Sequence, residues 1–93
     1  MELKKVLINS GKFVNGFQLE FNNGFNSTYT PWVGGRGGSQ ETWDVPTGEY
    51  ITQIEIRSGW YIDAITFITN TGNKSPMFGE GGGGYHLYTL PPG

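Results

Sequence analysis

Hydrophobic and polar residues alternate along most of this chain, in short runs separated by loops. Between Tyr50 and Arg57, Ile54 and Ile56 fall on one side while polar residues fall on the other. A period of two residues is typical of a β-strand that buries one face. No stretch keeps the 3.6-residue apolar period of an amphipathic helix over three turns. The pattern predicts eight short strands, at residues 5–9, 13–21, 28–33, 40–45, 50–57, 60–69, 75–78 and 85–90.

Glycine and asparagine clusters separate these runs. Asn22-Asn23-Gly24 and Asn70-Thr71-Gly72 each follow a predicted strand, and such residues tolerate the positive φ angles of tight turns. Sixteen glycines accompany six Phe, five Tyr and three Trp, which indicates tight loops between aromatic-rich strands rather than disorder. Pro31 confines the middle of its run to a sheet edge or a bulge. We therefore predict an all-β fold of antiparallel sheets.

The chain contains an internal repeat with an offset of 48 residues. Residues 6–15 (VLINSGKFVN) align with residues 54–63 (IEIRSGWYID), and Gly24 and Gly72 keep the same offset. Each copy ends in a glycine cluster, at residues 34–38 and 81–84. A repeat that holds four strands indicates two copies of one four-stranded unit. We expect a single domain over residues 1–93, with the copies at about 5–38 and 49–84.

Size, charge and composition limit the functions that the chain can have. Ninety-three residues make one domain near the lower size limit for independent folding. The net charge is −2 and only six residues are Lys or Arg, so the sequence has no basic stripe of the kind that binds nucleic acid or an anionic membrane. Cysteine is absent, which excludes disulfides and thiolate metal sites. The first residues lack the apolar run of a signal peptide, so we expect an intracellular protein or the mature form of a secreted one.

The segment Ser58–Asp63 (SGWYID) combines a turn, two aromatic residues and a carboxylate. Asp63 can accept strong, charge-assisted hydrogen bonds from two neighbouring sugar hydroxyls, while the N–H groups of Trp60 and Tyr61 can donate to sugar oxygens. A glycine loop such as residues 34–38 adds another N–H and lets the backbone come close, because no Cβ intervenes. The same residues also suit a tight turn in which Asp63 only binds its own loop. The residue types alone leave both interpretations open.

Several motifs together resemble the jacalin-related lectins. They are the Gly-Gly-x-Gly-Gly cluster and the runs 48–51 and 65–72, with a zymogen-granule-lectin-like VGGR at 33–36 and a griffithsin-like IRSGWYID at 56–63. The likeness extends along essentially the whole chain. It implies a β-prism I fold, in which three four-stranded Greek-key sheets surround a pseudo-threefold axis. It also implies mannose-type sites that combine a glycine-loop backbone with a Gly-x-Tyr-x-Asp segment.

Transferred residue by residue, the resemblance implies two carbohydrate-binding sites. The first combines three backbone N–H donors with one carboxylate, from Gly38, Trp60, Tyr61 and Asp63. The second has the same arrangement, from Gly84, Lys12, Phe13 and Asn15. Asparagine replaces the family's aspartate in the second site, which removes a charge-assisted contribution of ~1 kcal/mol or more. We predict a lectin for mannose- or glucose-type sugars whose second site is weak or vestigial.

The chain has strands for only two of the three units of that family. The missing unit resembles the one that both termini build in the usual domain, so its sugar site cannot be transferred here. Two sheets without a third leave an apolar flank uncovered, and such patches usually mark interfaces. We expect a homo-oligomer, and a shortened piece of a longer domain is the alternative. The alternative function is a structural or oligomerisation module with a vestigial sugar site.

Catalytic, metal and cofactor sites have little support in the sequence. Residues 79–84 match G-x-G-x-x-G, but no βαβ unit surrounds them, which argues against a dinucleotide site. His86 is the only histidine, and no cluster of further metal ligands accompanies it. The carboxylates show no spacing that singles out an acid/base pair. We predict a protein that is not an enzyme, without metal or cofactor, whose partners are glycans rather than nucleic acids or membranes.

Overall fold

The computed structural model describes residues 2–91, and all regular secondary structure in that range is β-strand. Nine strands are present there: β1 (Glu2–Ser10), β2 (Val14–Asn22), β3 (Ser27–Tyr29), β4 (Val33–Gly34), β5 (Ser39–Asp44), β6 (Ile51–Ser58), β7 (Ile62–Thr69), β8 (Phe78–Gly79) and β9 (Gly84–Thr89). Residues 2–91 accordingly include no membrane-spanning helix. The all-β prediction is confirmed.

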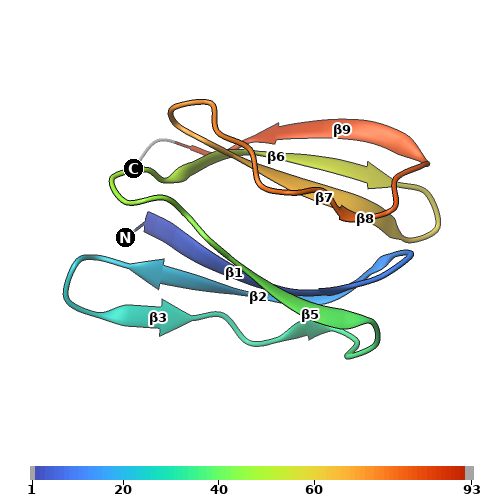
Figure 1. Ribbon diagram of the computed structural model, residues 1–93, viewed down its shortest axis with the longest axis horizontal. Coiled ribbons are helices and arrows are strands. Elements are labelled where there is room, and N and C mark those ends of the chain that lie inside the picture. Colours follow the sequence, from blue (N-terminus) through green and yellow to red (C-terminus); the bar gives the residue numbers. More distant parts are fainter. Residues whose placement is uncertain (1, 92–93) are drawn as a thin grey trace.

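The strands form two antiparallel sheets that pack as two layers (Figure 1). In the first sheet β1 lies between β2 and β5, and β2 pairs on its other side with β3 and β4. In the second sheet β6 lies between β7 and β9, and β8 pairs with β7. In both sheets the last strand returns to lie beside the first, which is the Greek-key order. Each half of the chain therefore builds one sheet.

Two predicted strands differ from those observed. The strand predicted at residues 28–33 is divided into β3 and β4, because Pro31 has no N–H to give to a ladder. Of the run predicted at residues 75–78, only Phe78 belongs to a strand, the short β8. The other six predicted strands overlap β1, β2, β5, β6, β7 and β9. Alternation thus located the long strands, and Pro31 divided one of the shorter ones.

The core lies between the inner faces of the two sheets. Val6 and Ile8 on the central strand β1 are fully buried, and burying a side chain of this size contributes about 1.5–3 kcal/mol. Trp43 of β5 stacks on Phe67 of the opposite sheet, with ring centroids 6.2 Å apart. The buried cluster consists of Leu3, Val6, Ile8, Val45, Ile51, Ile65, Phe67 and Phe78. The apolar positions of the alternating pattern are therefore the ones that join the two layers.

The two tight hairpin connections lie at the same end of the molecule. The connection between β1 and β2 and the one between β6 and β7 are adjacent in Figure 1, and β5 and β9 both begin at this end. The glycine clusters at residues 34–38 and 81–84 lead into β5 and β9. All segments that the sequence singled out for sugar binding are therefore collected at one end.

Candidate functional site

Asp63 and Asn15 each occupy a β-bulge at the hairpin end. In the second sheet Arg57 pairs with Ala64 and Ser58 pairs with Ile62, which leaves Asp63 as the extra residue. In the first sheet the pairs on either side of Asn15 show the same shift. A bulge bends the strand and changes the direction of the extra side chain. The polar residue of each segment is therefore turned out of the regular alternation of its strand.

The connection before each bulge leaves backbone donors available. The Gly59 N–H donates to the Tyr61 carbonyl at 3.0 Å, and the Gly11 N–H donates to the Phe13 carbonyl at the same distance. Among the described residues, the N–H groups of Trp60 and Tyr61 have no hydrogen-bond acceptor. Donors at a hairpin tip that no internal acceptor uses can bind water or a ligand. This end of the second sheet therefore offers two donors close to one carboxylate.

The glycine loops bring a bare backbone against these polar side chains. A methyl group on Gly83 would lie 2.5 Å from Asp63 Oδ2 and 2.7 Å from the Ser58 carbonyl oxygen. A methyl group on Gly38 would lie 2.6 Å from Asn15 Nδ2 and 2.7 Å from the Ser10 carbonyl oxygen. Both glycines also have positive φ, +69° and +79° respectively. Only glycine fits at these two positions, for reasons of both space and backbone conformation.

The structure changes the grouping of the predicted site residues. Gly38 lies against Asn15, and Gly84 pairs with Ser58 beside Asp63. The prediction had placed Gly38 with Asp63 and Gly84 with Asn15, and this grouping was wrong. The physical reason is that each glycine loop leads into a strand, β5 or β9, that pairs with the first strand of its own sheet. The carbohydrate-binding role of these residues stays a prediction.

The regrouping adds a residue that the sequence interpretation missed. Gly83, rather than Gly84, makes the close approach to the Asp63 carboxylate. The internal repeat was the signal for this grouping, because each copy builds its own sheet and so keeps its glycine cluster with its own polar segment. Gly38 and Gly83 then stand at matching places in the two sheets.

The loop of the first sheet is braced by side chains. The Trp32 Nε1–H donates to the Gly35 carbonyl at 2.9 Å, and Asn9 Nδ2 donates to the Arg36 carbonyl at 3.0 Å. The Arg36 guanidinium lies 4.2 Å from the centre of the Trp32 ring, a cation–π distance. Trp32 and Arg36 are therefore engaged in holding the loop beside Asn15.

Exposure and charge distinguish the Asp63 segment from its counterpart. The Trp60 side chain is 99% exposed and Tyr61 is 65% exposed, so both rings are accessible to a ligand. Asp63 is half-buried, and its carboxylate has no hydrogen bond or ion pair with any other described residue. Lys12 and Phe13 occupy the places of Trp60 and Tyr61 in the first sheet, with Lys12 Nζ 6.0 Å from the Phe13 ring centre. The second sheet therefore carries an unused acceptor between open aromatic rings and free donors.

Two Greek-key sheets packed face to face, each with a bulged polar residue against a glycine loop, define an all-β domain made of two similar units. The chain belongs to the Jacalin-like lectin domain family, whose model matches residues 1–92. The resemblance seen in the sequence is thereby confirmed, and so is the β-prism-like fold class.

Solved lectins share this fold at low sequence identity. Artocarpin complexed with methyl-α-mannose superposes with a TM-score of 0.83 and 12% identity, over 99% of this chain and 69% of artocarpin. A prostate-specific WGA16 glycoprotein lectin gives 0.80 and 21%, over 97% of this chain and 63% of that lectin. AcmJRL, a mannose-binding jacalin-related lectin from Ananas comosus, gives 0.78 and 23%, over 97% and 66%. The chain thus spans about two thirds of the length of these lectins.

A curated relative comes from Schizosaccharomyces pombe and is named as a zinc metalloproteinase. It is 29% identical over 90 residues, which cover 96% of this chain but only 14% of that protein. Residues 2–91 hold no group of three His, Asp or Glu side chains placed to bind a metal ion. The similarity therefore concerns a small part of the yeast protein.

Proposed function

We propose that this chain is a lectin that binds mannose- or glucose-type sugars at the hairpin end of its second sheet. The Asp63 carboxylate accepts hydrogen bonds from two sugar hydroxyls, and the N–H groups of Trp60 and Tyr61 donate to sugar oxygens. The Gly83–Gly84 backbone borders the sugar, in place of the Gly38 loop expected from the sequence. The corresponding site in the first sheet, with Gly38, Lys12, Phe13 and Asn15, is the weaker of the two.

The observation that carries this proposal is the unused hydrogen-bonding capacity around Asp63. Its carboxylate has no partner among residues 2–91, and two N–H donors beside it also lack acceptors. A sugar hydroxyl is both a donor and an acceptor, so it matches a carboxylate and an N–H group together. The open Trp60 and Tyr61 rings add apolar surface for the C–H face of the sugar. A neutral polyol therefore complements this end better than an ion does.

Two further findings favour mannose over other neutral sugars. The chain belongs to the Jacalin-like lectin domain family. Artocarpin, which has the same fold, was solved with methyl-α-mannose, and the Ananas comosus lectin is described as mannose-binding. Methyl-α-mannoside is therefore the first ligand to test, with the glucoside as the second.

Substitution of Asp63 tests the site. Asp63→Asn keeps the shape and removes the charge, so we expect methyl-α-mannoside to bind about tenfold more weakly, which corresponds to ~1.4 kcal/mol. Asp63→Ala removes the acceptor and should abolish binding. The measurement is a glycan array supported by a titration followed by NMR.

Asp44→Asn is the matched control, because Asp44 lies on β5, where it forms an ion pair with Lys5 at 3.5 Å. It should leave sugar binding unchanged. Undiminished mannoside binding by folded Asp63→Ala would contradict the assignment. Absence of any glycan hit, together with a stable oligomer, would favour the structural module instead.

We also propose that the protein binds glycans without cleaving them. Membership of a lectin domain family supports this. Incubation with p-nitrophenyl α-mannoside should release no p-nitrophenol. Release above the spontaneous rate, lost in Asp63→Ala, would make the protein a glycosidase.

We further infer that the chain self-associates through the inner side of β9. Tyr88 and His86 pair with Ile54 and Ile56, so they continue the inner apolar row of the second sheet to its edge. Ile54 and Ile56 pack on the core, whereas Tyr88 is 53% exposed. An uncovered inner row on an edge strand favours a second copy as its cover.

Light scattering tests this association. We expect an oligomer for the wild type and a shift to monomer for Tyr88→Asp. Tyr29→Asp is the control, because Tyr29 is also 53% exposed but lies on β3, opposite Glu20. A monodisperse wild-type monomer at high concentration would refute the association and leave the sugar site untouched.

A further inference from the structure

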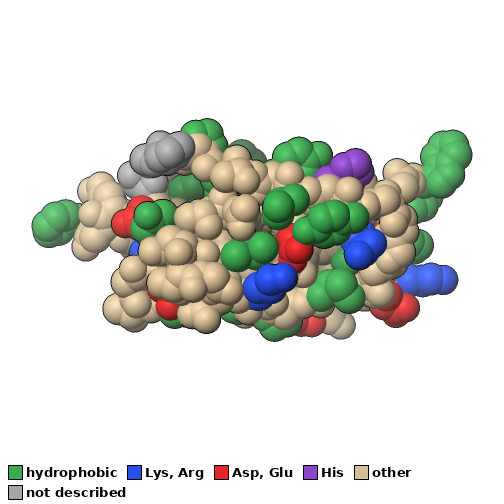
Figure 2. Space-filling model, turned by 90° about the horizontal axis from the view of Figure 1, so that it is seen from above, with side chains coloured by type: hydrophobic (Ala, Val, Ile, Leu, Met, Phe, Trp, Pro, Cys, Tyr) green, Lys and Arg blue, Asp and Glu red, His purple; other side chains and the backbone are tan. Residues whose placement is uncertain are grey.

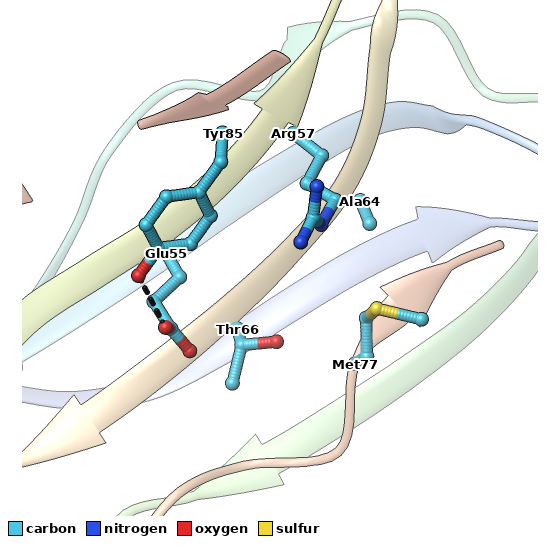
Figure 3. Close-up of a pocket in the computed structure, with 6 residues that line it drawn as sticks. All are labelled: Glu55, Arg57, Ala64, Thr66, Met77 and Tyr85. Carbon is cyan, nitrogen blue, oxygen red and sulfur yellow. Dashed lines mark hydrogen bonds between the residues drawn. The ribbon is translucent and has the colours of Figure 1, made fainter. Parts of the chain in front are cut away.

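A shallow pocket lies on the outer face of the second sheet, away from the core. In the ladder, Arg57 is opposite both Ala64 and Tyr85, and Glu55 is opposite Thr66, so these side chains share one face. Met77 closes the pocket from the segment before β8 (Figure 3). The small side chain of Ala64, which is 2% exposed, leaves the space between its longer neighbours. The pocket has a volume of ≈ 200 Å³ and is lined by Glu55, Arg57, Ala64, Thr66, Met77 and Tyr85.

The acidic side chain of this pocket is already satisfied. The Tyr85 hydroxyl donates to Glu55 Oε2 at 2.5 Å, and Lys74 Nζ lies 3.4 Å from Glu55 Oε1. These contacts keep Glu55 ionised: the Tyr85 hydrogen bond lowers the pKa of this carboxyl most, followed by the contact with Lys74. One carboxylate thus faces two cations, Lys74 and Arg57. Glu55 and Arg57 are the charged side chains of the lining, and Lys74, outside it, forms the ion pair with Glu55.

The Arg57 guanidinium has no ion-pair partner among the described residues. Its Cζ lies 5.3 Å from the centre of the Tyr85 ring, and no carboxylate among residues 2–91 lies within ion-pair distance of it. Figure 3 shows the guanidinium lying over the pocket between Tyr85 and Met77. A guanidinium held on an aromatic ring keeps its planar set of donors free for a carboxylate. The hydroxyl of Thr66 and the thioether of Met77 add one polar and one apolar contact.

The pocket adjoins the proposed sugar site. Arg57 directly precedes Ser58, Ala64 directly follows Asp63, and Tyr85 directly follows Gly84. Met77 Cε lies 3.7 Å from where a methyl group on Gly81 would stand, so the pocket also borders the glycine cluster. A volume of ≈ 200 Å³ is below the ~300–1,000 Å³ of pockets that enclose a whole ligand. The pocket suits one residue of a ligand that extends from its neighbour.

Figure 2 shows the molecule from above relative to Figure 1, with acidic and basic side chains set among hydrophobic ones near the middle of this surface. Such a mixture fits a sugar acid better than a purely apolar or purely anionic ligand. The pyranose ring has apolar C–H groups for Met77 and Tyr85, and the carboxylate complements Arg57.

We propose that this pocket is an accessory subsite for a uronic acid residue of a glycan. Its carboxylate binds the Arg57 guanidinium, while the adjoining neutral residue occupies the site at Asp63. In this extended form the inference rests on the proposed function. The affinity of the pocket for a sugar acid alone does not depend on the proposed function, because Asp63 makes no contact with a ligand bound only in the pocket.

The first test uses two disaccharides that differ in one group. Both contain mannose, linked in one case to glucuronate and in the other to glucose. The wild type should prefer the acidic disaccharide by about tenfold, the effect of one charge-assisted contact. Arg57→Gln should lose this preference and keep the affinity for the neutral disaccharide. Arg57 is exposed, so its replacement leaves the core intact, which circular dichroism would verify.

Arg36→Gln is the matched control, since it removes the same charge from the glycine loop of the first sheet and should keep the preference. Equal preference in Arg57→Gln and the wild type would overturn the proposal. Loss of the preference in Arg36→Gln instead would also overturn it, because acid recognition would then belong to the first sheet.

NMR titration separates this inference from the proposed function. Methyl glucuronide should shift the amide signals of Thr66 and Tyr85, in the wild type and in Asp63→Ala alike, whereas methyl glucoside should not. Such shifts without mannoside binding would reject the Asp63 site and support the carboxylate pocket. If Thr66 and Tyr85 do not respond to methyl glucuronide, the pocket proposal fails whatever Asp63 does.

Discussion

The rings of Phe13 and Tyr61 lie against each other, with centroids 5.1 Å apart and planes inclined by 42°. Phe13 belongs to the connection before β2 and Tyr61 to the connection before β7, so the contact joins corresponding positions of the two sheets. The bulged residues Asn15 and Asp63 follow two positions later in each copy. One aromatic contact thus sets the two candidate sugar sites side by side.

This contact should contribute measurable coupling between the sheets. Aromatic pairs are worth about 0.5–1.5 kcal/mol beyond the area they bury, and we expect the lower end here because Tyr61 is 65% exposed. Urea unfolding of the wild type, Phe13→Leu, Tyr61→Leu and the double variant gives the coupling energy. In a control cycle with Phe25→Leu, a residue that is 94% exposed, Tyr61→Leu should be additive within ~0.5 kcal/mol. Additivity in the Phe13 cycle as well would show that the contact stabilises nothing.

Asn15→Asp should strengthen the weaker sugar site, which lies in the first sheet. Asn15 takes the place of Asp63 at its own bulge, beside the Gly38 backbone, and its amide has no hydrogen-bond partner among the described residues. A carboxylate there would restore charge-assisted hydrogen bonds to two hydroxyls, which should tighten binding about tenfold. We expect a second binding event for methyl-α-mannoside in calorimetric or NMR titrations.

The combination with Asp63→Ala isolates this effect. In that background Asn15→Asp should recover mannoside binding, with shifts in the signals of Lys12, Phe13 and Gly38. Failure to recover any binding would show that the carboxylate is insufficient without the aromatic pair Trp60 and Tyr61. Recovery with shifts around Gly83 instead would contradict the grouping of the loops.

The alternating pattern was enough to place the long strands and the core. Ile54 and Ile56 were assigned to one side of their strand, and both pack against the core between the sheets. Strand positions depend on local periodicity, which the sequence displays directly. The short strands β3, β4 and β8 were located less well, because two-residue and three-residue pairings depend on the neighbouring strand β2 or β7 rather than on their own pattern.

The candidate site residues were named from the sequence, but the structure groups them differently, and their role in sugar binding stays a prediction. The pairing of Ser10 with Ser39 and of Ser58 with Gly84 decides which glycine loop meets which polar segment. That pairing follows from the return of the last strand to the first in each sheet, a long-range contact that no local pattern encodes. The bulges at Asn15 and Asp63 are likewise visible only once the register is known.

Alanine at Gly83 should destabilise the protein more than alanine at Gly82. Both glycines have positive φ, which costs an alanine about 1–2 kcal/mol. Gly82 has open space around it, whereas a methyl group on Gly83 meets the Ser58 backbone at 2.7 Å and Asp63 Oδ2 at 2.5 Å. The clash should add about 1–3 kcal/mol, as overpacking does elsewhere.

Thermal and urea unfolding would measure the difference, and mannoside titration should show weaker binding only for Gly83→Ala. Equal destabilisation by the two variants would contradict the close approach of Gly83 to Asp63.

A polar cluster around Glu49, in the turn before β6, stabilises the opposite end of the second sheet. Its Oε1 accepts hydrogen bonds from the hydroxyls of Thr69 and Thr71 at 2.6 and 2.7 Å, and both carboxylate oxygens accept from Asn73 Nδ2 at 3.0 Å. Lys4 Nζ donates to the Glu49 carbonyl at 2.6 Å, which ties this turn to the first sheet. The Thr69 hydrogen bond lowers the pKa of Glu49 most, followed by those of Thr71 and Asn73 and by the charge of Lys4.

The lowered pKa of Glu49 predicts a loss of stability in acid. The folded protein holds this carboxyl ionised at pH values where the unfolded chain, with a pKa near 4.5, already binds a proton. The stabilisation is therefore complete above about pH 5.5 and decreases as the pH falls through 4.5 and below. The free energy of unfolding, measured by urea denaturation between pH 7 and pH 3, should vary less in Glu49→Gln than in the wild type. Part of the slope should remain, because Glu55 also has a lowered pKa.

Glu41→Gln is the control and should keep the wild-type slope. Glu41 lies on the exposed strand β5 and has no hydrogen bond among the described side chains. An unchanged slope in Glu49→Gln would show that the Thr69 and Thr71 hydroxyls do not favour the ionised carboxylate.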